Sequence, residues 1–300
     1  MTLLLIFLAF VAAGLYFARL VVYPKIFSLE ETYRTEIETG RMDAAVFEAY
    51  RPQAVEIRSP FGYNLFGYYL QQPQGSARSV ILAHGITYSL YGAVKYIELF
   101  WRRGYNIFLY DHRAHGRSGG RGCTFGLYET YDLQACFDWV QNQLPSGGIV
   151  GIHGESYGAA IALQFAARDA RPAFVVADAA FADLTALLRH RLRVDYHLPA
   201  FPLLNLASFW AARLTGMAFG MISPVRTAAN IRCPVFFIHG ADDTFTPAWM
   251  SQSLYHAKTN GARRLLFIPH AEHAQSYWTD PIRYDRELGE FLTENSLPQE

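Results

Sequence analysis

One serine stands between two glycines in the stretch Gly154-Glu155-Ser156-Tyr157-Gly158, after an apolar run and before a run of small residues. This order predicts a buried strand, a sharp turn and a helix, with the serine at the turn. A Cβ atom at either glycine would crowd the facing backbone of so tight a turn. The pattern G-x-S-x-G is that of a nucleophile elbow, so we predict that Ser156 is a nucleophile rather than an ordinary turn residue.

A serine hydroxyl is a weak nucleophile at neutral pH and requires a general base. Two histidines follow the last apolar run, in the stretch IPHAEHAQSY at residues 268–277. His270 directly follows the predicted strand end, where a structural histidine is typical. His273 lies deeper in the loop and closer to the last helix, so we predict that His273 is the base.

A histidine base needs a carboxylate that holds its tautomer and stabilises the imidazolium. Asp242 and Asp243 both follow the apolar run PVFFIHG. Their position alone does not choose between them. Either residue gives the chain order serine, aspartate, histidine, which is the order that accompanies a nucleophile elbow.

The tetrahedral intermediate of acyl transfer needs N–H donors for its oxyanion. We predict the backbone N–H groups of Tyr157, at the start of the helix after the serine, and of Ile86, in the stretch HGIT after an apolar run. A glycine-rich loop at residues 111–122, DHRAHGRSGGRG, lacks the spacing of a phosphate-binding loop. We expect this loop to buttress the site.

The elements that must position these residues alternate along the chain. Continuous apolar runs, typical of strands buried on both faces, occur at residues 79–85, 106–111, 148–153, 173–178, 234–240 and 264–269. Helical stretches separate them, which predicts an α/β fold with a mostly parallel central sheet flanked by helices. Sites in such sheets lie at the carboxyl ends of the strands, where the candidate residues fall.

From about residue 54 onward the chain resembles the α/β-hydrolase superfamily, and within it the bacterial membrane-anchored serine hydrolases of the esterase-like and prolyl-oligopeptidase-like group. The resemblance rests on HGIT, DHRAHGRSGG, GESYGA, and HGADDTFTP with AEHAQSY, in this order. It implies the triad Ser156, Asp243 and His273, because the superfamily's acid stands four residues after the strand-end histidine. It implies no particular substrate. Glu155 replaces the histidine of many lipases, and we expect it to support the turn.

Residues 181–228 lie between two predicted strands and are too many for a simple crossover, which predicts a helical lid over the serine. The segment is rich in Leu, Phe, Trp and Met, which favours acyl chains or other hydrophobic groups in the substrate. Its arginines at positions 189, 191 and 193 fit a solvated helix face, or a site for a carboxylate or lipid headgroup.

The N-terminus has a different character, because residues 3–18 contain no charge. About 20 apolar residues span a bilayer, so we predict a transmembrane anchor at residues 1–23 and a polar connector at residues 24–53. A cleaved signal peptide would need a positive n-region, which is missing. A buried core helix suits neither the length nor the terminal position. The basic residues after the anchor predict a single-pass membrane protein with its hydrolase domain, residues 54–300, in the cytoplasm.

The amino-acid composition limits which classes of partner the protein can bind. Lys plus Arg and Asp plus Glu are balanced at 26 each, so the basic footprint of a nucleic-acid-binding protein is missing. Three widely spaced cysteines indicate neither a disulfide framework nor a zinc site, and we expect no metal and no cofactor. We predict a serine hydrolase that cleaves an ester or related acyl bond of a small-molecule or lipid-like substrate. The alternatives are a peptidase or amidase with the same triad, and a non-enzymatic interaction protein that retains the fold.

Overall fold

The central feature of the fold is a sheet of eight strands in the part of the chain that the structure describes. The computed structural model describes residues 1–295, although not the side chains of residues 3–7. The spatial order of the strands is β1-β2-β4-β3-β5-β6-β7-β8. The pairs β1–β2 and β2–β4 are antiparallel, and every later pair is parallel. The prediction of a mostly parallel sheet in an α/β fold is confirmed.

The elements alternate along the chain as expected for crossovers between parallel strands. The strands are β1 (Gln53–Arg58), β2 (Asn64–Leu70), β3 (Arg78–Ala83), β4 (Asn106–Tyr110), β5 (Ile149–Glu155), β6 (Val175–Asp178), β7 (Val235–Gly240) and β8 (Arg263–Ile268). The helices are α1 (Thr2–Val22), α2 (Leu29–Glu38), α3 (Ala44–Ala49), α4 (Ile97–Trp101), α5 (Glu129–Gln141), α6 (Tyr157–Ala166), α7 (Leu184–Tyr196), α8 (Leu203–Thr215), α9 (Pro224–Thr227), α10 (Trp249–Ala257), α11 (Ser276–Thr279) and α12 (Pro281–Glu294). Short 3-10 helices lie at η1 (Leu90–Tyr96), η2 (Phe219–Met221) and η3 (Ala228–Asn230). A helix separates each pair of successive parallel strands, because such a connection must cross over the sheet.

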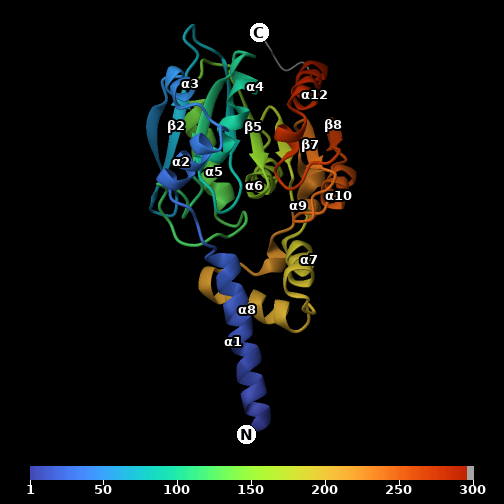
Figure 1. Cartoon of the computed structure of the whole chain (residues 1–300). Coiled ribbons are helices and arrows are strands. Elements are labelled where there is room, and N and C mark those ends of the chain that lie inside the picture. Colours follow the sequence, from blue (N-terminus) through green and yellow to red (C-terminus); the bar gives the residue numbers. More distant parts are fainter. Residues whose placement is uncertain (296–300) are drawn as a thin grey trace.

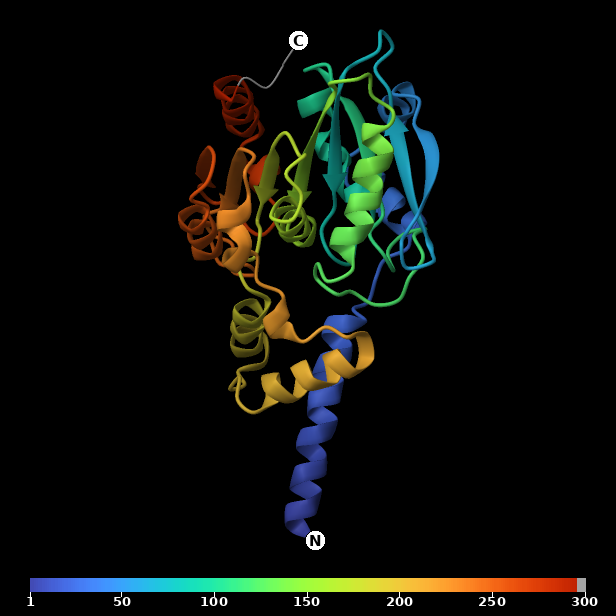
Figure 2. The same ribbon diagram turned by 180° about the vertical axis from the view of Figure 1, so that it is seen from behind.

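Both faces of the sheet are buried, which explains the continuous apolar runs. In β3, Ile81 and Ala83 belong to a core shared with α5 and α6. Val80 and Leu82 of the same strand belong to a core shared with α4 and α12. Successive side chains of a strand point to opposite faces, so a strand covered on both sides must be apolar at every position. Figure 2 views the sheet from the side that α5 and α6 cover.

The insertion between β6 and β7 is helical, as the sequence predicts. The helix α7 begins after Asp183, whose carboxylate accepts a hydrogen bond from the Ala186 amide. The helix α8 ends at Gly216, which has a left-handed conformation that glycine adopts without strain. Both helices lie outside the layers of the hydrolase fold, next to α1 (Figure 1). We call α7 and α8 the lid helices.

The helix α1 packs on the lid with its C-terminal half, while its N-terminal half projects away from the body (Figure 1). An added Cβ at Gly14 would lie 2.6 Å from the Cβ of Leu206 in α8. Ala18 and Val22 are fully buried. Within the described residues, no helix combines the length and the apolar character that a membrane span requires, so the predicted anchor at residues 1–23 is not supported. The C-terminal half of α1, by contrast, has a partner within the protein, because Gly14 meets Leu206 of α8.

The predicted connector at residues 24–53 is docked on the hydrolase domain. Ser28 caps α2 in a reciprocal pair with Glu31, a capping box that fixes the start of the helix. The hydroxyls of Thr32 and Ser89 lie 2.5 Å apart in a buried contact. A spacer would leave these polar groups in solvent. The segment therefore forms one wall of the domain rather than a free linker.

Candidate active site

Side chains from three loops form a hydrogen-bonded chain at the carboxyl ends of the strands. Ser156 follows β5, Asp243 lies after β7 and His273 lies after β8. The Ser156 Oγ atom lies 2.9 Å from His273 Nε2. The Nδ1 atom of His273 lies 2.7 Å from Asp243 Oδ2. Both distances are in the range of hydrogen bonds, so the structure brings together the three residues that the sequence predicts as a triad.

The turn that carries Ser156 is strained. Its φ of 52° and ψ of −110° form a conformation that residues other than glycine rarely adopt. An added Cβ would lie 2.5 Å from the Gly158 oxygen at Gly154, and 2.2 Å from the Ala83 oxygen at Gly158. Both glycines are therefore required because backbone segments approach each other closely here. This close packing of the backbone fixes the turn, and it holds the Ser156 hydroxyl beside the His273 ring.

Burial distinguishes Asp243 from Asp242, which their position in the sequence could not rank, and it agrees with the choice of His273 over His270. The Asp243 side chain is fully buried and that of His273 is 23% exposed. In contrast, the side chains of Asp242 and His270 are 60% and 90% exposed, and they face each other at 3.6 Å. The second pair lies on the surface, apart from the serine. The structure thus sets Asp243 and His273 together with Ser156, and leaves Asp242 and His270 outside.

The environment of Asp243 keeps it ionised. Burial alone would raise the pKa of this carboxyl, but hydrogen bonds from His239 and His273 outweigh burial and hold the pKa below its ordinary range. Its Oδ1 atom also accepts the amides of Phe245 and Thr246, at 2.9 and 2.8 Å. With Oδ1 used in this way, Oδ2 is directed to the Nδ1 atom of His273. The carboxylate therefore remains a charged acceptor for that ring.

Glu155 connects the elbow to a buried ionic network. Its Oε2 atom lies 2.5 Å from Lys95 Nζ and accepts the Tyr96 hydroxyl at 2.6 Å. Lys95 also donates a hydrogen bond to the backbone oxygen of Ala274, the residue after His273, at 3.2 Å. Beneath the turn, the Ser156 amide donates to the Asp178 oxygen at 2.7 Å. The sequence assigned Glu155 no chemical role. In the structure, Glu155 connects the loop of Ser156 to the loop of His273 through its ion pair with Lys95.

Replacing Lys95 by methionine is expected to lower the free energy of unfolding by about 3–5 kcal/mol, because it leaves the Glu155 carboxylate buried and unpaired. The double variant Lys95→Met/Glu155→Gln is expected to recover much of that loss. Arg117→Met is the control, since the ion pair of Arg117 with Glu30 is exposed and worth at most about 1 kcal/mol. Urea unfolding followed by circular dichroism measures all three. An unchanged midpoint for Lys95→Met would contradict the assignment.

Three buried histidines brace the loop after β3. His84 Nε2 accepts the His112 amide at 3.0 Å, and His115 Nε2 accepts the Thr87 amide at 3.2 Å. Burial lowers the pKa of all three rings, so they stay neutral and able to accept these bonds. His112 and His115 belong to the glycine-rich loop at residues 111–122, which buttresses the site as expected. The bracing holds Ile86 beside the serine.

A groove of about 370 Å³ lies next to the Ser156 and His273 side chains. Ile86, Ser156 and His273 line it, which brings one predicted oxyanion donor into the same space as the nucleophile and base. Sequence reasoning missed the opposite wall, which includes Glu36, Arg41, Tyr88, Lys95 and Trp278. Two of these residues come from the segment interpreted as a connector. The capping box of Ser28 and Glu31 is the signal that could have indicated an ordered helix there.

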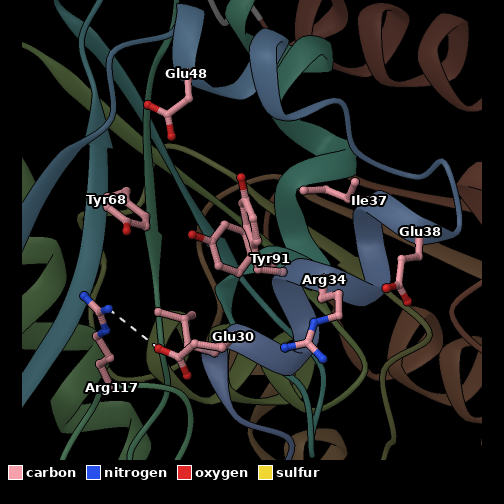
Figure 3. Close-up of a pocket in the computed structure, with 10 residues that line it drawn as sticks. Glu30, Arg34, Ile37, Glu38, Glu48, Tyr68, Tyr91 and Arg117 are labelled. Atoms are coloured by element: carbon pink, nitrogen blue, oxygen red, sulfur yellow. Dashed lines mark ion pairs between the residues drawn. The ribbon is translucent and has the colours of Figure 1, made fainter.

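Another hollow, of about 540 Å³, lies between α2, β2 and η1. Figure 3 shows Tyr68 and Tyr91 there, beside an ion pair between Glu30 and Arg117. The side chains that line it include acids, arginines and tyrosines, but no serine, cysteine or histidine among the described residues. It therefore offers no serine or cysteine nucleophile beside a histidine base, although it is larger than the groove. The groove that contains Ser156 is therefore the candidate active site.

Comparison with known proteins agrees with this geometry. Residues 78–192 match the alpha/beta hydrolase fold family. The uncharacterized protein YqkD of Bacillus subtilis (strain 168) is 34% identical over 286 residues, which cover 95% of this chain and 93% of YqkD. An esterase of Pyrococcus furiosus superposes with a TM-score of 0.69 at 25% identity, covering 84% of this chain and 94% of the esterase. The acylaminoacyl peptidase of Pyrococcus horikoshii shares the fold, with a TM-score of 0.63 at 17% identity, covering 86% of this chain and 44% of the peptidase.

The family match spans β3 to α7, and the similarity to YqkD extends over nearly the whole chain. The strand order, the strained serine turn and the order of the three loops along the chain are those of the same fold. The chain belongs to the α/β-hydrolase superfamily.

Proposed function

We propose that this protein is a serine hydrolase that cleaves an ester or related acyl bond through an acyl-enzyme. The observation that carries the proposal is the relay of Ser156, His273 and Asp243, with successive distances of 2.9 and 2.7 Å. A nucleophile, a base and an orienting acid in hydrogen-bond contact are the parts that acyl transfer needs. The similarity to the esterase of Pyrococcus furiosus supports the same chemistry.

In the proposed mechanism, the Oγ atom of Ser156 attacks the carbonyl carbon while the Nε2 atom of His273 takes the hydroxyl proton. Asp243 stays ionised, keeps the remaining ring proton on Nδ1 and stabilises the imidazolium. His273 then returns its proton to the leaving group, which departs and leaves an acyl-enzyme. Water, deprotonated by the same histidine, releases the acid and restores the serine.

The oxyanion of both tetrahedral intermediates is proposed to accept the backbone N–H groups of Ile86 and Tyr157. Tyr157 is the first residue of α6, and the first N–H groups of a helix have no partner within it. The positive end of the helix dipole also favours a negative charge there. Ile86 lines the groove with Ser156. One such donor typically contributes about 10²–10³-fold in kcat.

Two other functions use the same observations differently. A peptidase or amidase would need the same three residues. The acylaminoacyl peptidase of Pyrococcus horikoshii shares the fold, so a peptidase is the second candidate function. An interaction protein that retains the fold would have no need for three aligned groups. Esters are the first choice because their leaving group departs more readily, and because the groove shares Phe245 with a hydrophobic cavity that the lid helices line.

The test is a fluorophosphonate probe, followed by a panel of p-nitrophenyl esters and matched aminoacyl p-nitroanilides. We expect covalent labelling, and a higher kcat/KM on the esters than on the anilides. Faster turnover of the anilides would identify a peptidase or amidase. A chain that neither takes the label nor turns over any substrate would be a binding protein, and the proposed hydrolase would be rejected.

A further inference from the structure

A second cavity, of about 210 Å³, lies between α1 and the lid helices α7 and α8. Figure 1 shows these three helices together beneath the hydrolase layers. The walls include Phe17, Leu20 and Val21 of α1, Leu188 of α7 and Leu204 of α8. The cavity is therefore built from segments far apart in the sequence, and the N-terminal helix is one of its sides.

Phe245 joins this cavity to the catalytic groove, because its side chain lines both of them. Its ring centroid lies 4.7 Å from that of His273. An acyl group attached to Ser156 would have to pass this side chain to enter the cavity. A single side chain therefore stands between the cavity and the groove that contains Ser156 and His273.

The charged groups in the wall are already paired. Arg191 Nη2 donates to Asp195 Oδ1 at 2.6 Å, and its guanidinium stacks 4.1 Å from the Phe245 ring centroid. Most of the other lining side chains are leucine, phenylalanine, valine or alanine. A polar ligand group would lose its water here without gaining a partner, whereas a hydrocarbon chain loses nothing.

The α1 wall is held in place by close packing. Gly14 allows the backbone of α1 to approach Leu206 in α8, where an added Cβ would lie 2.6 Å away. The rings of Phe17 and Tyr196 meet edge to face at 5.0 Å between centroids. Because α1 is fixed to both lid helices, it forms a defined boundary rather than a loose cover.

We propose that this cavity binds the acyl chain of the substrate, and that α1 sets the length of the chain it accepts. The inference rests on the proposed ester hydrolysis and names its substrate class. A water-sized group takes about 30 Å³, so 210 Å³ corresponds to about seven groups of that size. A chain of about eight carbons, such as an octanoyl group, is close to this volume.

The full-length protein is assayed on the p-nitrophenyl esters of acetate, butyrate, octanoate and dodecanoate. We expect kcat/KM of the wild type to rise about fourfold per methylene up to octanoate, the gain for burying one CH₂ group, and then to level off. Leu188→Trp and Val21→Trp fill the cavity, so they should lower kcat/KM on octanoate by at least about tenfold and leave acetate almost unchanged. Leu188→Ala enlarges the cavity and should move the preference toward dodecanoate.

Val194→Trp is the matched control. Val194 lies on α7, is 44% exposed and does not line the cavity, so it should leave the chain-length profile unchanged. Thermal unfolding checks that each variant is folded. If a tryptophan variant does not fold, Leu188→Ala still decides the question. Identical chain-length profiles for the wild type and Leu188→Ala would overturn the proposal.

A binding measurement separates this inference from the proposed function. Octanoate is titrated by calorimetry into Ser156→Ala, alone and combined with Leu188→Trp or Val21→Trp. Binding to the first and its loss in the combined variants supports the cavity, even if the wild type hydrolyses no ester and the proposed function fails. Hydrolysis of the acetate ester together with octanoate binding that the tryptophans do not weaken would overturn the cavity proposal and leave the hydrolase standing.

Discussion

Replacing Ser156 by alanine is expected to abolish fluorophosphonate labelling and to lower kcat on an activated ester by about 10⁶-fold, the loss that follows removal of a triad nucleophile. The physical reason is that no other hydroxyl lies within hydrogen-bond distance of His273 Nε2 in the described part of the chain. The variant should fold like the wild type, because the Ser156 side chain makes its hydrogen bond to the histidine and does not cap α6.

Ser253→Ala provides the control for this variant. Ser253 lies on α10, and its hydroxyl donates to the Trp249 oxygen rather than to any group of the groove. It should keep full labelling and full activity. The assignment of the nucleophile would be wrong if Ser156→Ala were still labelled, with the label on another serine.

The second large effect is expected for Asp243→Asn, which should lower kcat by about 10⁴-fold with little change in fold. Asparagine keeps an oxygen for the amides of Phe245 and Thr246, so the loop should hold its shape. Its NH₂ group would then face the Nδ1 atom of His273, which favours the tautomer with its proton on the wrong nitrogen. A histidine in that tautomer cannot accept the proton of Ser156.

Asp242→Asn is the matched control, because the two residues are adjacent and differ in burial. The side chain of Asp242 is 60% exposed and faces His270. Its replacement should change kcat by less than about tenfold, since a surface substitution alters few contacts. Both variants are measured on one activated ester. The reverse ranking would transfer the orienting role to Asp242.

Much of the fold and of the relay was predictable because the relevant signals are local. The alternation of Val80 and Leu82 with Ile81 and Ala83 on the two faces of β3 requires an unbroken apolar run, so the run predicted the strand. Turn geometry likewise makes glycines necessary on both sides of Ser156. Chain order along a parallel sheet then placed the acid and the base in the loops after later strands.

The physical reason for preferring one of two neighbouring residues lies in tertiary contacts. Asp242 and Asp243 have the same chemistry, and so do His270 and His273. Only the packed loops show that the first of each pair faces solvent and the second faces the serine loop. The motif resemblance chose Asp243, but the geometric reason, an Oδ1 atom engaged by two amides, exists only in the folded chain.

By itself the sequence determined the strands, the serine turn and the superfamily, because backbone geometry and burial on both faces of a sheet act on neighbouring residues. The tertiary structure decided the partners of segments whose pattern is ambiguous. The uncharged helix α1 packs on α8, the polar segment after it forms a wall of the groove, and Glu155 pairs with Lys95, sixty positions earlier in the chain. An apolar or charged side chain in the sequence indicates that burial or an opposite charge is needed. Which residue provides it is decided only when distant segments pack together.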